Sequence, residues 1–247
     1  MTTSYRRCFT LFFCVIHAGS IGSSQSRPQG AAQPAVRNPL LDDWGQLARY
    51  RAANLQLSSP GTFENRVVFF GDSITERWGR EGGFFPGKPY INRGIKGQTT
   101  PQMLVRFRAD VIALQPKVVV ILAGTNDIAE NTGPTTLEAI EDNLMSMVDL
   151  ARVHGIRVVL GAVLPAIDFP WKRGLDPAGK IVTLNLWIRD YCSKQELFFL
   201  DYYSALADEK GGLRTEFTFD GVHPNEAGYQ VMTPLAEKAI GQAIARH

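Results

Sequence analysis

Ser73 lies in the segment RVVFFGDSITERWG, residues 66–79, where its hydroxyl group could do one of two things. The run Ser73-Ile74-Thr75-Glu76 fits a capping box, in which the serine oxygen accepts a hydrogen bond from the third helical N–H and the glutamate reaches back. A serine can also attack a carbonyl carbon when a positioned base removes its proton, and that base is most often a histidine held by a carboxylate. The segment by itself leaves both interpretations open.

The chain has four histidines, and His223 is the one with the sequence context of a base. His17 is close to the N-terminus, His247 is the last residue, and His154 stands before a helix-ending glycine, where the helix dipole favours a cation. His223 lies in the loop DGVHP, three residues after Asp220. A carboxylate at that spacing could fix the tautomer of the imidazole ring and stabilise its protonated form. Packing against the last helix is an equally good explanation on spacing alone.

Acyl transfer also needs hydrogen-bond donors for the oxyanion that develops on the carbonyl oxygen. The backbone N–H of Ser73 is one candidate, because it opens a predicted helix. The N–H of Gly94 and the side-chain amide of Asn126 are the others. A turn glycine and an asparagine bonded to its own backbone are the structural alternatives for these two positions.

Alternating strands and helices are predicted to position these groups. Four apolar runs without polar alternation, and one shorter run, are typical of a parallel sheet covered by helices on both faces. The predicted strands are residues 66–70, 89–93, 117–123, 156–164 and 197–201. The predicted helices are 40–57, the segment after Thr99-Thr100-Pro101, residues 134–154, and a last helix from about Pro224. This order predicts a three-layer α/β domain whose site lies where the loops after the strands converge.

The N-terminus does not fit that domain. Residues 1–26 have two arginines, then an apolar run and small residues, which is the pattern of a secretory signal peptide cleaved between Ala18 and Ser26. Residues 27–39 are rich in Pro, Ala and Gln and are predicted to be a flexible linker, which leaves 40–247 as the folded domain. We therefore expect a secreted or periplasmic protein with no membrane span after cleavage.

Charge and cysteine content exclude several other classes. The whole chain has a formal net charge of +2, and loss of the two arginines of the leader makes it neutral, so a nucleic-acid partner is not expected. Cys192 is the one cysteine outside the leader, so we expect no internal disulfide, and a small buried residue rather than a nucleophile.

Four motifs in order carry a resemblance to the SGNH or GDSL family of serine esterases and lipases. They are GDSIT, NRGIKGQTT, GTND and DGVHP. The family's residues correspond to Ser73, Gly94, Asn126 and His223, with Asp220 completing a triad. The resemblance implies a flavodoxin-like fold with a five-stranded parallel sheet, hydrolysis through an acyl-enzyme, and no metal or cofactor. Leu often follows the serine in the family, and Ile stands there in this chain.

Rival chemistries have weaker support. The segment GGFFPGKP, residues 82–89, lacks the Ser or Thr of a phosphate-binding loop and follows no buried strand. No cluster of His, Cys and carboxylates suggests a metal site. Asp72 and Asp127 could form the carboxylate pair of a glycosidase, but short polar side chains at such positions most often bond to their own turns. The remaining rival is a secreted carbohydrate-binding protein that kept the fold without the chemistry.

The substrate is predicted only by class. We expect a small-molecule or carbohydrate ester, with acetyl as the acyl group, while a lysophospholipase or thioesterase fits the family equally well. The segment LPAIDFPWKRGLDP, residues 164–177, is the expected specificity loop. Five aromatic residues could wall the site or cover the edge of the core: Trp78, Phe84, Phe85, Phe169 and Trp171.

Overall fold

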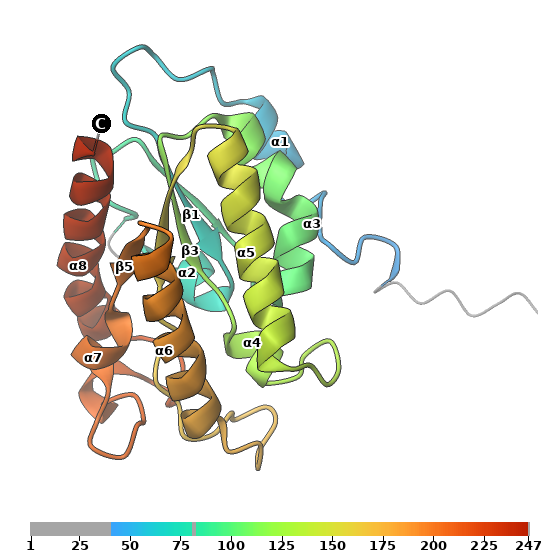
Figure 1. Ribbon diagram of the computed structural model, residues 1–247, viewed down its shortest axis with the longest axis vertical. Coiled ribbons are helices and arrows are strands. Elements are labelled where there is room, and N and C mark those ends of the chain that lie inside the picture. Colours follow the sequence, from blue (N-terminus) through green and yellow to red (C-terminus); the bar gives the residue numbers. More distant parts are fainter. Residues whose placement is uncertain (1–40, 81–82, 247) are drawn as a thin grey trace, which may run out of the picture. The chain divides into compact units, whose positions relative to one another are not determined.

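A parallel β-sheet with helices on both faces forms the framework of the protein. The computed structural model describes residues 41–80 and 83–246; the expected leader and linker lie outside these ranges. The sheet has five parallel strands in the order β2-β1-β3-β4-β5 (Figure 1). The strands are β1 (Val67–Gly71), β2 (Tyr90–Gly94), β3 (Val118–Leu122), β4 (Arg157–Gly161) and β5 (Phe198–Leu200). The predicted three-layer α/β fold with a five-stranded parallel sheet is confirmed.

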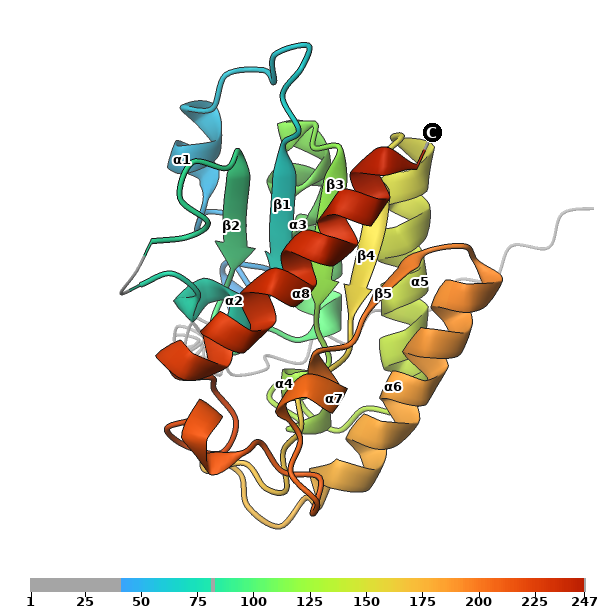
Figure 2. The same cartoon turned by 90° about the vertical axis from the view of Figure 1, so that its left-hand side faces the viewer.

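Helices cover the sheet in two layers. One layer contains α3, α5 and α6, and α8 crosses the other face with the short α7 beside it (Figures 1 and 2). The α-helices are α1 (Arg51–Leu55), α2 (Ser73–Arg77), α3 (Thr100–Asp110), α4 (Thr125–Ile128), α5 (Leu137–Val153), α6 (Pro177–Lys194), α7 (Tyr202–Leu206) and α8 (Glu226–Ala245). Two 3₁₀ helices are η2 (Ile112–Leu114) and η3 (Thr215–Phe217). Within the described ranges, no helix combines the length and apolarity needed to cross a membrane.

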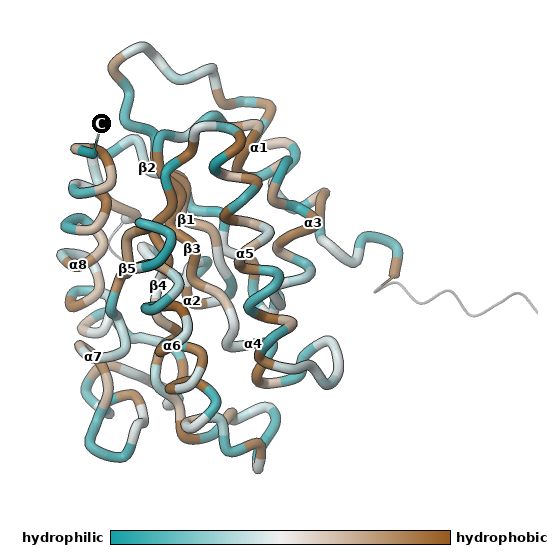
Figure 3. Tube along the Cα trace, in the orientation of Figure 1, coloured by the Kyte–Doolittle hydropathy of each residue, from teal (hydrophilic) through white to brown (hydrophobic). Residues whose placement is uncertain are grey.

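The central strands are buried on both faces, which explains their unbroken apolar sequences. In β1, Val68 and Phe70 pack in the core beneath α3 and α5, while Val67 and Phe69 pack in the core beneath α8. Successive side chains of a strand point to opposite faces, so a strand covered on both sides needs apolar residues at every position. Figure 3 shows the result as a hydrophobic band along the strands.

The predicted helix over residues 40–57 is wrong for most of its length. Residues 42–45 and 47–50 form turns, and only Arg51–Leu55 is α-helical. The carboxylate of Asp43 accepts hydrogen bonds from the N–H groups of Leu47 and Ala48, and Gln46 has a left-handed φ of 54°. A side chain that satisfies these N–H groups in a turn competes directly with the helix.

The carboxyl ends of the strands lie together at one edge of the sheet. In Figure 2 the arrowheads point to this edge, where α2, α4 and α7 begin immediately after β1, β3 and β5. The loop between η3 and α8 reaches the same edge. The residues predicted to do chemistry therefore approach one another from four separate segments, as expected for an open parallel sheet.

Candidate active site

Ser73 is the first residue of α2, and its hydroxyl does not cap the helix. The cap is Asp72, whose Oδ1 accepts a hydrogen bond of 2.9 Å from the N–H of Ile74. Ser73 Oγ instead lies 2.9 Å from Nε2 of His223. The capping-box interpretation of Ser73 and Glu76 is therefore wrong, because the preceding aspartate takes that role and frees the serine.

His223 is held by Asp220 through both its ring and its backbone. Asp220 Oδ2 lies 2.7 Å from the ring Nδ1, and Oδ1 accepts from the main-chain N–H of His223 at 2.8 Å. The N–H of Val222 also donates to Oδ1, at 3.0 Å. Because Nδ1 faces a carboxylate, the neutral ring has its proton on Nδ1 and its lone pair on Nε2, toward Ser73. The geometry is that of a serine, a general base and an orienting acid.

The electrostatics of this loop favour a neutral imidazole and an ionised carboxylate. Burial lowers the pKa of His223 from its ordinary 6.5, while Asp220 raises it, and the charges of Arg77 and Lys96 lower it further. Burial raises the pKa of Asp220, but the hydrogen bonds from His223 and Val222 bring it below the ordinary value for a carboxyl group. A histidine that is neutral near pH 7 can accept the proton of the serine hydroxyl.

A buried hydrogen-bond network lies on the inner side of Ser73. The side-chain amide of Asn126 donates to Asp72 Oδ2 at 3.1 Å and to the carbonyl oxygen of Gln98 at 3.0 Å. Its own carbonyl oxygen accepts from Nδ2 of Asn131 at 2.7 Å. Burial raises the pKa of Asp72 to about 7, and the negative charge of Asp127 raises it too. The amide nitrogen of Asn126 is therefore held by Asp72 and Gln98, which lie far away in sequence, rather than by its own turn.

Gly97, and not the predicted Gly94, is the glycine whose N–H has no acceptor among the described residues. The N–H of Gly94 donates to Asn92 Oδ1 at 2.9 Å, and a Cβ there would lie 2.1 Å from the backbone nitrogen of Glu76. Gly94 is therefore a packing residue that lets α2 approach β2. Gly97 has a φ of 78° and its carbonyl accepts from Asn131. Among the described residues, the N–H groups of Ser73 and Gly97 have no hydrogen-bond acceptor.

Sequence reasoning missed Gly97, although one signal was present. The glycine stands between Lys96 and Gln98, in the middle of the NRGIKGQTT motif rather than at the end of the strand. A loop that must turn sharply beside a ligand favours a glycine with positive φ. The motif contains two glycines, and only the three-dimensional structure distinguishes the one whose N–H is free.

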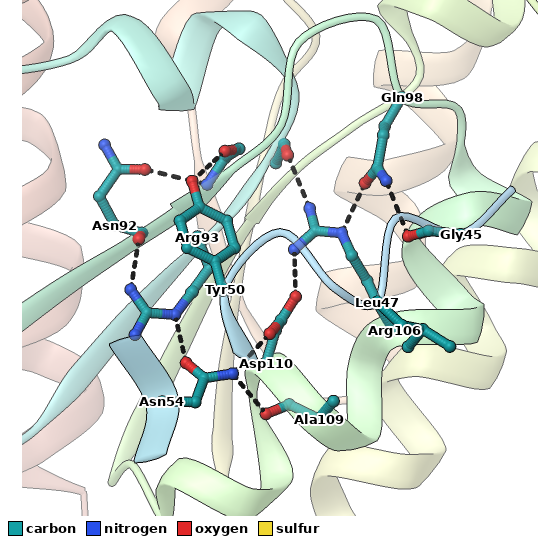
Figure 4. Close-up of polar contacts among 12 residues, drawn as sticks. Gly45, Leu47, Tyr50, Asn54, Asn92, Arg93, Gln98, Arg106, Ala109 and Asp110 are labelled. Carbon is teal, nitrogen blue, oxygen red and sulfur yellow. Dashed lines mark hydrogen bonds and ion pairs between the residues drawn. The ribbon is translucent and has the colours of Figure 1, made fainter. Parts of the chain in front are cut away.

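Arg106 ties this loop to the end of β1. The side chain is fully buried, and Figure 4 shows it between Gln98 and Asp110. Its Nε donates to Gln98 Oε1 at 2.5 Å, Nη1 to Asp110 Oδ2 at 3.1 Å, and Nη2 to the carbonyl of Gly71 at 3.0 Å. Gly71 directly precedes Asp72, so one guanidinium group contacts both the strand that leads to Ser73 and the loop that contains Gly97.

Two exposed aromatic rings flank His223 on the outer side. The ring of Phe219 lies 5.8 Å from the imidazole and almost parallel to it, and the ring of Trp171 lies 5.8 Å away on a tilt. Their exposed fractions are 56% and 44%. Trp171 comes from the predicted specificity loop, and its indole N–H donates to Asn131 Oδ1 at 3.0 Å. Phe219 was missed by sequence reasoning, although it directly precedes Asp220.

The other four aromatic residues considered for the site belong to the core instead. Trp78, Phe85 and Phe169 are buried at 6%, 6% and 0% exposure. Phe84 packs edge-on against Phe69 of the sheet. These rings cover the edges of the core, which was the alternative explanation for aromatic residues in loops.

The remaining candidates have structural roles. The carboxylate of Asp127 accepts from the N–H and hydroxyl of Thr100, at the start of α3. Cys192 is buried in α6, and burial raises its pKa to about 12, which makes it inert. In the part of the chain that the structure describes, no three side chains of the metal-binding types come together.

Comparison with known proteins supports an acylhydrolase. The model of the GDSL-like lipase/acylhydrolase family matches residues 69–231. A crystal structure of a putative acylhydrolase from Bacteroides fragilis is 45% identical with a TM-score of 0.79, over 81% of this chain and 97% of that one. An acetylxylan esterase from Geobacillus stearothermophilus is 26% identical over 71% of this chain and 94% of its own length.

A second curated relative is matched over less of its length. An uncharacterized lipoprotein from Bacillus subtilis is 32% identical to half of this chain. The chain spans 44% of that relative.

Proposed function

The chain belongs to the GDSL-like lipase/acylhydrolase family, and we propose that it is an exported serine esterase that hydrolyses small acyl esters, with acetyl as the acyl group and a carbohydrate as the alcohol. The observation that carries the proposal is the continuous contact from Ser73 Oγ through His223 to Asp220, at 2.9 and 2.7 Å. In a non-catalytic binding protein nothing would require these three groups from two distant segments to meet.

The proposed reaction has two steps. His223 Nε2 takes the hydroxyl proton of Ser73 as Oγ attacks the ester carbonyl, and the collapse of the tetrahedral intermediate breaks the bond to the alcohol oxygen. His223 gives its proton to that oxygen, which leaves as the free alcohol, and an acyl-enzyme remains. A water molecule, activated by the same histidine, then releases the carboxylic acid. Asp220 orients the ring and stabilises the imidazolium in both steps.

Three donors are proposed for the oxyanion: the N–H groups of Ser73 and Gly97 and the amide of Asn126. The two N–H groups have no acceptor among the described residues, so they are available to a ligand without loss of an existing hydrogen bond. The amide of Asn126 already donates to Asp72 and Gln98. If one of these N–H groups is shared with the oxyanion, that hydrogen bond strengthens as negative charge develops on the oxygen. Stabilisation at that stage lowers the barrier.

The proposed substrate class depends on the outer side of the site. Trp171 and Phe219 present broad apolar surfaces beside His223, together with polar groups such as Asn131. Flat apolar walls with a few polar groups suit a small amphipathic alcohol such as a sugar. One relative is an acetylxylan esterase, which agrees with an acetylated carbohydrate. Export is supported by the leader pattern of residues 1–26 and by a relative that is named a lipoprotein.

A panel of p-nitrophenyl esters tests the proposal. The wild-type protein should hydrolyse the acetyl ester with higher kcat/KM than the butyryl ester, and the octanoyl ester should be the poorest substrate. Acetate should also be released from acetylated xylan. A preference for octanoyl would favour a lysophospholipase or thioesterase, and turnover no higher than that of Ser73→Ala would favour the non-catalytic binding protein.

A further inference from the structure

A pocket of about 600 Å³ lies beside the proposed active site, between α2 and the start of α8. It is lined by Arg77, Arg80, Phe219 and Asn225, among others. Phe219 forms the boundary with the site, because its ring also stacks against His223. Pro224, the residue after His223, lines the pocket as well. A group bound in this pocket would therefore lie next to His223.

The described lining of the pocket contains two arginines, Arg77 and Arg80, and one acidic residue, Glu226. Arg77 forms no ion pair within the described ranges, and its guanidinium carbon lies 5.2 Å from the centre of the Phe219 ring. Arg80 is 3.6 Å from Glu76, a carboxylate that also binds Arg49 at 3.2 Å. Glu226 forms no ion pair with either arginine within the described ranges, and its carboxylate lies 3.5 Å from Nε2 of Gln230.

The position of this charge relative to His223 identifies which part of the substrate it would meet. His223 gives its proton to the oxygen of the departing alcohol, so the space next to its ring holds the alcohol rather than the acyl group. Phe219 spans the interval between that ring and Arg77. A substituent of the alcohol that lies across Phe219 would thus reach the guanidinium group. An unpaired arginine suits a carboxylate or a phosphate, which it can bind with two parallel hydrogen bonds.

We propose that this pocket binds an anionic group on the alcohol part of the ester, so that the preferred substrate is an acyl ester of an acidic alcohol, such as a uronic acid or a sugar phosphate. The inference rests on the proposed esterase function and adds its substrate class. The positive charges of Arg77 and Lys96, which lower the pKa of His223, are consistent with a site built around an anion.

Inhibition of p-nitrophenyl acetate hydrolysis is the first test. D-Galacturonate should inhibit wild type with a Ki about ten-fold below that of D-galactose, and glycerol 3-phosphate about ten-fold below glycerol, the range expected for one charge-assisted hydrogen bond. The two anions distinguish a carboxylate from a phosphate site. Arg77→Gln should remove the preference, and added salt should weaken it. Equal Ki values for charged and neutral compounds in wild type would overturn the inference.

The second test compares substrates. The ratio of kcat/KM for acetylated oligogalacturonate to that for acetylated xylo-oligosaccharide should fall about ten-fold in Arg77→Gln. Lys194→Gln is the matched control, because it also removes one positive charge but lies at the end of α6, before β5 begins, on the opposite edge of the sheet. An unchanged ratio in Arg77→Gln, or an equal fall in Lys194→Gln, would contradict the inference. No hydrolysis of any ester would contradict the proposed function instead.

Discussion

A carboxyl group lies on each side of Ser73, and the pKa values of the two groups shift in opposite directions. On the inner side, the Asp72 carboxyl is 1% exposed and its pKa rises to about 7 because burial disfavours its charge. On the outer side, Asp220 is half-buried and receives three hydrogen bonds around His223, and its pKa falls. The inner carboxyl serves as a hydrogen-bond acceptor that fixes geometry. The outer one stays charged and can stabilise an imidazolium.

The two sides also differ in how completely their polar groups are satisfied. Arg106 has acceptors on all three of its guanidinium nitrogens and is fully buried. Arg77, on the outer side, has only the face of an aromatic ring among the described residues. A closed network is suited to rigidity, whereas unpaired groups are available to a ligand. The inner side is therefore suited to fixing the geometry of Ser73, and the outer side is where we propose that substrate choice is made.

The largest loss of activity should come from breaking the outer contact chain itself. Ser73→Ala and His223→Ala should each lower kcat for p-nitrophenyl acetate by at least about a thousand-fold, because each removes one member of a unit that acts together. The double variant should be little worse than either single variant. Losses that multiply in the double variant would show that the two residues act independently.

Breaking the buried network on the inner side should act mainly on the stability of the fold. Arg106→Met leaves the buried Asp110 without its charged partner, which should lower the free energy of unfolding by about 3–5 kcal/mol. Arg189→Met is the control, because its pair with Asp201 is largely exposed and should contribute less than about 1 kcal/mol. Urea unfolding followed by circular dichroism measures both. Equal losses would contradict the distinction between a closed network and a surface pair.

Asn126 connects the two sides, and its removal should slow the reaction without weakening substrate binding. Asn126→Ala should lower kcat by about 10²–10³-fold with little change in KM, as expected for an oxyanion donor. Asp72→Asn should lower kcat less, because the amide of Asn126 stays in place and only the group that it faces changes from an acceptor to a donor. Full activity of Asn126→Ala would refute its role in the oxyanion hole.

The smallest effect should be a shift in the pH profile. His223 must be neutral to accept a proton, so kcat/KM rises as the pH passes upward through its pKa, which lies below 6.5. Arg77 lowers that pKa, so Arg77→Gln should raise it and move the acid limb to higher pH. The limb should stay in place in Lys194→Gln. A shift to lower pH in Arg77→Gln would show that its charge does not act on His223.

Sequence patterns predicted the features that depend on local order. Buried strands need continuous apolar residues, so the five strands were located within one to three residues of their observed bounds. The position of His223 in a loop and the spacing to Asp220 indicated the pair that the structure brings together. Each of these signals is contained in a short segment.

Features that depend on distant contacts could not be read from the sequence. Asp127 bonds to Thr100, and Gly94 is required by α2, which packs against it. In each case the deciding neighbour lies elsewhere in the chain, and no periodicity identifies it.

Covalent labelling tests the central claim most directly, because it asks whether Ser73 is an activated nucleophile. A fluorophosphonate should add once to the wild-type protein, and peptide mass spectrometry should locate the adduct on Ser73. His223→Ala should be labelled far more slowly, since the base is lost, while Lys194→Gln should react like wild type. Ester hydrolysis with an adduct on another residue, or labelling of Ser73 at the same rate without His223, would contradict the account.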